Sequence, residues 1–417
     1  MIAAWAWLPE LGGIRMERGD GARGLMDLAI RTGAEMEDVP AHWRALPTGV
    51  DLQVHLRFPG QASKETLEGG LASALAGGVD TVLTMPNTNP FLDDPAVLAA
   101  AIRDVRGRNP GPVDVLFSAS GTRGMTGEAA SPIADLVRAG AVAVTDDGWG
   151  VRSPEAMKEV LRACASAGVP FLQHAEMPGH RGVAAAGDFQ RASGLPEYPR
   201  GVESQMVRRD VELLRGVPGA RYHVLHVTTK DTLEEVRRAK EMGLPVTCEV
   251  TPHHLFFSHR DIPPESDPRS ASFKMNPPLF DPADRDALRA ALASGLVDFV
   301  STDHAPHEAE NKRSGWRTAP FGTRGLETML PVLTALVHEG VLSWGRLEEV
   351  FSLAARKFIG ASRVPGLLFV DPEARWTVEE RHLPGISRNS CFLGARLTGR
   401  LEWRGEAGRL YRRIPGT

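Results

Sequence analysis

Eight short apolar runs, separated by longer amphipathic stretches, constrain the fold of this chain more than any other feature. They occupy residues 50–56, 81–86, 113–119, 141–146, 169–175, 222–227, 245–251 and 297–303. The segments between them, such as residues 154–168 and 229–243, show helical periodicity and close on glycine, as helix C-caps do. Eight strands that alternate with helices over about 250 residues predict an α/β fold, the (β/α)8 TIM barrel.

The two ends of the chain lack this alternation. They contain short strand-like runs, among them GLLFVD, ARLTGRLEWRG and GRLYRRI. We therefore predict a small flanking β domain formed by residues 1–49 and 361–417, attached to a barrel of residues 50–360. Pro- and Gly-containing stretches near residues 46–50 and 364–366 support these boundaries.

Charge and cysteine content narrow the class of protein. Lys and Arg number 48 against 52 Asp and Glu, and the chain has no block of like charges that would predict binding to nucleic acid or a membrane surface. The cysteines Cys164, Cys248 and Cys391 are far apart, which argues against disulfides and a cysteine-ligated zinc. The N-terminus, with Pro9 and Glu10, fits neither a signal peptide nor a membrane span. We expect a cytoplasmic protein that acts on a small molecule.

Polar and ionisable side chains gather where the predicted strands end. They are Gln53, His55, Arg57, Asp146, Asp147, His174, His226, Asp303, His304 and His307. The carboxyl ends of the strands in such a barrel meet at one mouth, which carries the active site. Imidazoles and carboxylates are ligands that zinc prefers, and a bound zinc lowers the pKa of water to near 7. The pattern therefore predicts a zinc-dependent hydrolase.

Three further histidines receive other predictions. His223 precedes His226 by three residues, so strand alternation should turn it toward the outer helices. His253 and His254 either position a loop or bind metal, and the loop role is favoured.

Seven motifs occur in a fixed order along the chain: DLQVHLRFPG, TMPNTNP, TDDG, HVTTK, TPHHL, FKMNPPL and STDHAPH. Together they resemble the type I dihydroorotases of the amidohydrolase superfamily. The resemblance implies a cyclic amidohydrolase that reversibly hydrolyses (S)-dihydroorotate to N-carbamoyl-L-aspartate in pyrimidine biosynthesis. Allantoinases and dihydropyrimidinases, a second alternative, carry a carbamylated lysine where this chain has Asp147.

The resemblance also implies roles for individual residues. Asp147 would be shared between two metal sites, with His174 and His226 in one and His55 and Asp303 in the other. Asp303 would act as general base and then as general acid. The substrate contacts would be His55, Arg57, Asn87, Asn276, His307, Phe321 and Gly322.

The first strand departs from the family pattern D-x-H-x-H-x-R, because Gln53 replaces the first histidine. A neutral amide is a poor zinc ligand, so we expect one or two zinc ions per subunit, with weak binding on the Gln53 side. An alternative function follows: a catalytically impaired scaffold that partners aspartate carbamoyltransferase. A homo-oligomer is also left open.

Overall fold

Eight parallel strands form the centre of the molecule in the computed structural model, which describes residues 42–109, 111, 113–406 and 409–412. They are β2 (Gly49–Val54), β3 (Val79–Thr84), β4 (Asp114–Ser120), β5 (Ala141–Thr145), β6 (Phe171–Gln173), β7 (Tyr222–Val224), β8 (Val246–Val250) and β9 (Phe299–Val300). Neighbours in sequence are neighbours in the sheet. The barrel closes where the His55 N–H donates to the His304 carbonyl at 2.9 Å. The predicted TIM barrel is confirmed.

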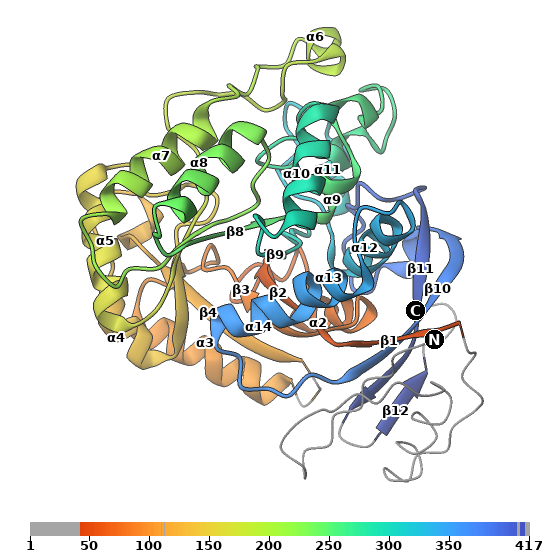
Figure 1. The fold of residues 1–417 in the computed structure, drawn as a ribbon, viewed down its shortest axis with the longest axis horizontal. Helices are drawn as coiled ribbons and strands as arrows, with labels where there is room; N and C mark the ends of the chain where they lie inside the picture. The colour runs from red at the N-terminus through yellow and green to blue at the C-terminus, as the bar shows by residue number, and fades with distance from the viewer. Residues whose placement is uncertain (1–41, 110, 112, 407–408, 413–417) are drawn as a thin grey trace.

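Helices surround the barrel (Figure 1). The longer ones are α2 (Leu67–Ala76), α3 (Pro95–Arg108), α4 (Ile133–Ala139), α5 (Pro154–Ala167), α7 (Val202–Leu214), α8 (Lys230–Glu241), α10 (Pro282–Ser294) and α12 (Met329–His338). Their ends follow from local chemistry. The Ser153 side chain accepts a hydrogen bond at the start of α5, Pro154 occupies its first turn, and the left-handed Gly168 ends it.

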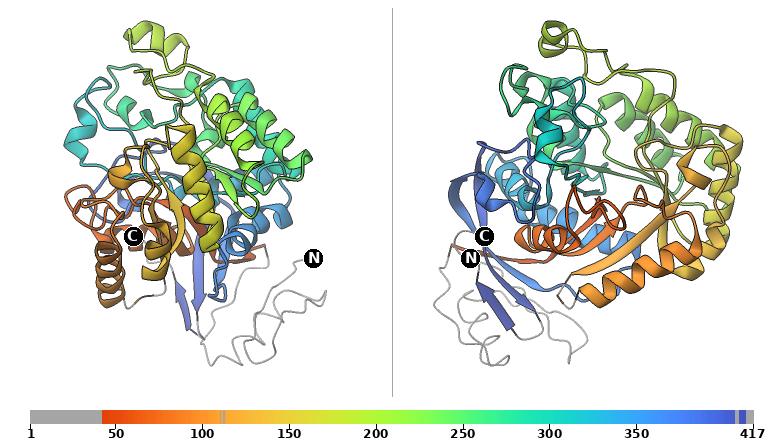
Figure 2. Two further views of the ribbon diagram at one scale, coloured as in Figure 1. Left: turned by 90° about the vertical axis from the view of Figure 1, so that its left-hand side faces the viewer. Right: turned by 180° about the vertical axis from the view of Figure 1, so that it is seen from behind.

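Short helices lie in the connections and after α12. They are α6 (Asp188–Ser193), α9 (Pro252–Phe256), α11 (Ala309–Arg313), α13 (Trp344–Glu348) and α14 (Ala354–Ile359), with a π-helical segment at Glu349–Leu353. Short 3-10 helices lie at Arg123–Met125, His259–Asp261, Ser270–Phe273, Leu326–Thr328 and Glu380–His382. Figure 2 shows α6 on a loop that extends from the body of the molecule. No helix in the described part of the chain has the length and apolarity needed to cross a membrane.

The barrel strands separate two apolar cores. Side chains such as Leu52, Leu83 and Phe299 pack inside the barrel, where Ala355 of α14 joins them. A larger cluster, which includes Val224, fills the space between the strands and the outer helices. Each strand is therefore covered on both faces, as expected for a parallel sheet.

His223 lies inside the barrel, so the prediction that it faces the outer helices is wrong. Its ring stacks on Phe299 with a centroid distance of 4.9 Å, and its Nε2 lies 3.2 Å from Glu249 Oε2. His226 lies beyond the end of β7 and has a φ of +34°. Because that backbone turn interrupts strand alternation, the spacing between the two histidines does not place them on opposite faces.

A separate antiparallel sheet joins segments from both ends of the described chain. Its order is β1 (Arg44–Pro47), β10 (Leu367–Thr377), β11 (Arg396–Glu406) and β12 (Arg409–Arg412). Figures 1 and 2 show β10 and β11 on the side of the molecule away from α4 and α5. The flanking β structure is confirmed, and its boundaries as a domain stay a prediction. The part predicted for residues 1–41 lies outside the described residues.

Candidate metal centre and active site

Three of the predicted site residues have a left-handed backbone. The φ angle is +58° at Arg57, +34° at His226 and +48° at Asp303, and these residues follow the ends of β2, β7 and β9. Residues other than glycine rarely adopt this conformation, and strained residues cluster at functional sites. The strain therefore lies at the strand ends where the sequence predicts the active site.

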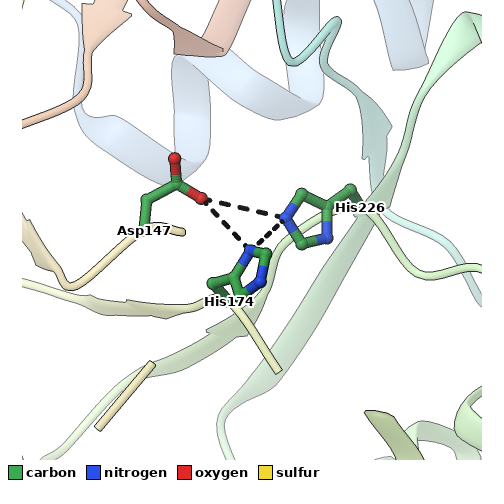
Figure 3. A group of neighbouring side chains, drawn as sticks. All are labelled: Asp147, His174 and His226. Atoms are coloured by element: carbon green, nitrogen blue, oxygen red, sulfur yellow. Dashed lines mark hydrogen bonds and ion pairs between the residues drawn. The ribbon is translucent and has the colours of Figure 1, made fainter. Parts of the chain in front are cut away.

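Asp147, His174 and His226, which follow β5, β6 and β7, point toward one another (Figure 3). His174 Nδ1 lies 2.9 Å from His226 Nε2, and Asp147 Oδ1 lies 3.6 Å from the first nitrogen and 3.8 Å from the second. All three side chains are buried. Tetrahedral zinc with bonds of about 2.0–2.1 Å separates its ligand atoms by about 3.3 Å. The observed distances lie on both sides of this value, so the three ligand atoms are spaced as a candidate metal site requires.

The same cluster favours positive charge. Burial alone would raise the pKa of Asp147, but hydrogen bonds with His174, His226 and His55 hold it well below its usual range. Burial would lower the pKa of His174, but Asp147 and Glu176 raise it to about 10. A buried carboxylate that stays ionised among imidazoles supplies the charge that a divalent cation requires.

A second candidate group shares Asp147. His55 Nε2 lies 3.2 Å from Asp147 Oδ2 and 3.0 Å from Asp303 Oδ1. On its other side, His55 Nδ1 lies 2.9 Å from Asn87 Oδ1, so Nδ1–H donates to the amide and Nε2 faces the carboxylates. Asn87, predicted to hold substrate, thus also positions His55, and its Nδ2 donates to the Asp147 carbonyl at 3.3 Å.

Gln53 lies beside the shared carboxylate. Its Nε2 donates a hydrogen bond of 3.1 Å to Asp147 Oδ1. Its Oε1 is buried and has no hydrogen-bond partner within the described residues. The amide offers Asp147 an N–H where an imidazole could offer a metal its lone pair. Gln53 therefore contacts Asp147 as a hydrogen-bond donor.

The residues predicted to bind substrate form a contact chain around the loop of residues 306–323. Arg57 Nε donates to the Pro306 carbonyl at 2.9 Å, and its Nη2 lies 3.0 Å from His307 Nε2. That nitrogen also lies 2.7 Å from the Phe321 carbonyl oxygen. Burial and the nearby Arg57 lower the pKa of His307 to about 2, so its ring is neutral. A neutral imidazole nitrogen serves one of these partners at a time, according to its tautomer.

Gly322 in the same loop has no room for a side chain. Its φ is +135°, and a Cβ atom would lie 2.7 Å from Ala305 Cβ and 2.8 Å from the Ala305 carbonyl oxygen. Only glycine lets the backbone pass this close. The predicted contact of residues 321 and 322 with substrate therefore depends on backbone shape.

Asn276 lies on the other side of the site, against a residue that the sequence analysis missed. Its Nδ2 donates to Glu176 Oε2 at 2.7 Å, and the same oxygen lies 2.9 Å from His174 Nε2. Burial would raise the pKa of Glu176, but its contacts with His174 and Asn276 lower it to about 2. The sequence signal that could have indicated Glu176 is its position, two residues after His174.

The histidines of the TPHH motif differ in their contacts. His254 Nδ1 lies 2.8 Å from Thr251 Oγ1, and its Nε2 lies 3.2 Å from the Pro277 carbonyl, next to Asn276. His254 therefore positions a loop of the site, as the favoured prediction has it. His253 is buried, and neither candidate metal group in the described residues includes it.

Two buried lysines were also missed by the sequence analysis. Lys312 Nζ donates to the carbonyl oxygens of Lys274 at 3.1 Å, Pro320 at 3.0 Å and Gly322 at 2.9 Å. Lys274 Nζ lies 4.8 Å from the centroid of the Phe321 ring. Both ammonium groups thus hold the loop that carries predicted substrate contacts.

Comparison with known proteins agrees with this geometry. Residues 44–232 match the family model described as Dihydro-orotase-like. The dihydroorotase of Bacillus caldolyticus is 37% identical over 393 residues, which cover 91% of this chain and 90% of that protein. That of Lactiplantibacillus plantarum is 38% identical over 359 residues, or 84% and 82% of the two chains.

Solved structures show the same fold. The L-hydantoinase (dihydropyrimidinase) from Arthrobacter aurescens superposes with a TM-score of 0.77 at 24% identity, over 91% of this chain and 90% of that chain. The D-hydantoinase (dihydropyrimidinase) from Thermus sp. gives 0.72 at 21% identity, over 91% and 89%. The fold, the site and the curated relatives together define an enzyme barrel of the amidohydrolase superfamily. Within that superfamily, the chain belongs to the dihydroorotase family.

Proposed function

We propose that this protein is a dihydroorotase, which interconverts dihydroorotate and N-carbamoyl-L-aspartate. Water adds to the ring amide carbonyl, the carbon–nitrogen bond breaks, and the ring nitrogen takes up a proton. The reverse reaction closes the ring with loss of water. The identity of 37% with a dihydroorotase over 90% of its length carries this proposal. The cluster of Asp147, His174 and His226 beside Asp303 supplies a matching catalytic centre.

The proposed metal is zinc, held by Asp147, His174 and His226. When bound there, it would supply a Lewis acid that polarises the amide carbonyl and lowers the pKa of water. Gln53 donates to Asp147 and offers no imidazole, so the site formed by His55, Asp147 and Asp303 is proposed to bind a second zinc weakly or not at all.

Asp303 is the proposed acid and base. Its Oδ1 lies 3.0 Å from His55 Nε2, which orients the carboxylate at the mouth. In hydrolysis, Asp303 accepts a proton from the attacking water and delivers it to the leaving ring nitrogen. Proton transfer by a positioned group of this kind contributes about 10² to 10⁴ in rate.

The other predicted residues are proposed to bind substrate. Arg57, which is buried and permanently charged, suits the substrate carboxylate because its guanidinium can make two parallel hydrogen bonds. Asn87 is proposed to share this carboxylate, while His307, Phe321 and Gly322 contact the ring. Asn276 and His55 complete the set.

Purified protein loaded with zinc tests the proposal by cyclisation of N-carbamoyl-L-aspartate and ring opening of dihydroorotate. We expect turnover in both directions and loss of at least about 10²-fold in kcat for Asp303→Asn. Absence of turnover in wild-type protein that holds zinc would refute the proposal. Turnover of hydantoin or allantoin in place of dihydroorotate would assign another cyclic amidohydrolase.

The scaffold alternative is not favoured by these relatives, because each compared family member is named for the enzyme. Association with aspartate carbamoyltransferase, a homo-oligomer and a cytoplasmic location stay predictions. Gel filtration of the purified chain, alone and with that transcarbamoylase, tests the two assembly states.

A further inference from the structure

One carboxylate joins the candidate metal centre to the proposed substrate pocket. Glu176 lies in the loop after β6, with its side chain 22% exposed. Its Oε2 lies 2.9 Å from His174 Nε2 and 2.7 Å from Asn276 Nδ2. A carboxylate oxygen has two lone pairs, so a single atom can accept from both donors.

The contact with His174 determines which nitrogen of that ring faces the metal. When Nε2–H donates to Glu176, the lone pair of a neutral His174 ring lies on Nδ1. This is the nitrogen that faces His226 and Asp147. Carboxylate partners of this kind fix the orientation and basicity of metal-binding histidines, and their loss costs about 10- to 100-fold in metal affinity.

The contact with Asn276 determines which end of that amide the substrate meets. The amide nitrogen is directed at Glu176, so the oxygen, on the other branch of the amide, is the atom that faces away from Glu176. An oxygen presented in this way accepts hydrogen bonds and donates none. Dihydroorotate carries ring N–H groups, which are the donors that such an oxygen would recognise.

Other contacts hold Glu176 in this position. His180 Nε2 lies 3.0 Å from its second oxygen, Oε1, and the Gly182 N–H donates to His180 Nδ1 at 3.2 Å. Two donors, from His174 and Asn276, thus meet at Oε2, and the His180 ring lies beside Oε1. A glutamine has one oxygen, so its NH2 group would replace a carboxylate oxygen beside either the two donors or the His180 ring.

We propose that Glu176 is a positioning residue that couples the zinc ligand His174 to the substrate contact Asn276. Its carboxylate holds His174 for the metal and turns the Asn276 oxygen toward a ring N–H of the substrate. The substrate half of this inference rests on the proposed dihydroorotase function, whereas the metal half depends only on the cluster of Asp147, His174 and His226.

The test compares Glu176→Gln and Glu176→Asp with wild type in two measurements. Zinc affinity is measured by competition with a chelator, and KM and kcat for dihydroorotate are measured at saturating zinc. For Glu176→Gln we expect zinc affinity to fall about 10- to 100-fold. KM should rise several-fold, with a smaller change in kcat, and Glu176→Asp should restore part of both losses. Glu197→Gln, which removes an exposed carboxylate from the same loop, is the charge-matched control.

A double-mutant cycle with Asn276→Ala tests the coupling. In the Asn276→Ala background, Glu176→Gln should no longer raise KM, although it should still weaken zinc binding. Additive effects on KM, or zinc affinity within twofold of wild type for folded Glu176→Gln, would overturn the inference. If wild-type protein binds zinc but lacks turnover, the proposed function fails, and zinc affinity alone then decides the role of Glu176. Circular dichroism and thermal melting verify that each variant is folded.

Discussion

The amide of Gln53 helps to compensate the negative charge of Asp147 through a hydrogen bond. It donates to the carboxylate oxygen that faces His174 and His226, and it places no imidazole in the neighbouring group. Replacing it with histidine removes this donor and adds a lone pair beside His55.

We therefore expect Gln53→His to raise the metal content from about one zinc per chain to about two. Elemental analysis after dialysis against dilute zinc makes the measurement. Gln53→Leu is the control, because it removes the hydrogen bond without adding a ligand, and it should stay at about one zinc. Equal metal content in all three proteins would contradict the proposed effect of Gln53.

A second residue-scale prediction concerns buried acids among the barrel strands. Burial raises the pKa of Glu249 to about 8 and that of Asp51 to about 7. Unfolded carboxyl groups titrate near pH 4. Between the unfolded and folded pKa values, the folded protein binds more protons than the unfolded chain. The contribution of these two carboxyl groups to the free energy of unfolding therefore falls as pH rises.

Glu249→Gln removes one of these titrating groups at nearly constant shape. We expect its free energy of unfolding to lose less with rising pH than that of wild type, by up to about 1.4 kcal/mol per pH unit. Urea unfolding measures this slope at several pH values between about 4, near the unfolded pKa, and about 8, the folded pKa of Glu249. Parallel pH profiles for both proteins would show that Glu249 is ionised in the folded state.

A site residue could be predicted from the sequence where it directly follows a predicted strand. A residue whose role depends on a distant contact could not. Asp147, His174 and His226 follow three apolar runs, so barrel geometry was enough to bring them together. Glu176 was missed because its significance comes from Asn276, a hundred residues later in the chain. His223 was misplaced because the backbone turn at His226 is a tertiary feature that strand alternation does not include.

Among the structural elements, the loop of residues 306–323 is held by a buried lysine. The ammonium of Lys312 donates to three backbone carbonyls, including that of Gly322. Burial and the neighbouring Lys274 lower the pKa of Lys312 to about 7. Without Lys312 the Pro320 carbonyl would lose its donor, which costs about 1–3 kcal/mol. The Lys274 and Gly322 carbonyls would keep the Gly322 N–H at 2.9 Å and Asn389 Nδ2 at 3.2 Å. The loop conformation thus depends on this side chain.

We expect Lys312→Met to lower the free energy of unfolding by about 1–3 kcal/mol. It should also raise KM for dihydroorotate several-fold, because Phe321 and Gly322 lose their support. Denaturant unfolding and steady-state kinetics measure the two effects. Lys357→Met, at an exposed lysine of α14, is the control and should change neither value. A large loss of stability with an unchanged KM would show that the loop does not contact substrate.

All eight strands were predicted from sequence, but several run shorter than their apolar patterns. The last pattern covers residues 297–303, whereas β9 spans Phe299–Val300. Its final residues leave the sheet because Asp303 has a left-handed backbone and Thr302 hydrogen-bonds to Asp51. Apolar content predicted the strand, and site geometry determined where it ends.

At the scale of the whole molecule, the segment between β10 and β11 packs against the barrel. Asn389 in this segment accepts from the His307 N–H at 2.9 Å and donates to the Gly322 carbonyl at 3.2 Å. Residues predicted as part of the flanking β domain therefore contact the loop that carries predicted substrate contacts. No local pattern in residues 384–394 indicates a partner on the barrel, so this contact could not be predicted from the sequence.

A buried ion-pair network anchors the same segment. Arg324, which is fully buried, donates to the Ser387 carbonyl at 2.7 Å, pairs with Glu65 at 3.3 Å and contacts Glu327. Glu65 in turn accepts from the Ile386 N–H at 3.0 Å. Removing the guanidinium would leave two carboxylates buried without their cation, a change that costs about 3–5 kcal/mol.

We therefore expect Arg324→Met to lower the free energy of unfolding by about 3–5 kcal/mol and to weaken dihydroorotate binding through the loop that Asn389 holds. Arg237→Met breaks an exposed pair with Glu234 and should cost less than about 1 kcal/mol. Urea denaturation of both variants gives the comparison, and hydrogen exchange reports on residues 384–394. In Arg324→Met, the backbone amides of this segment should exchange faster than in wild type. This exchange should occur through local opening, which requires less free energy than global unfolding. Equal losses of stability for the two variants, with unchanged exchange, would show that the segment is held without this network.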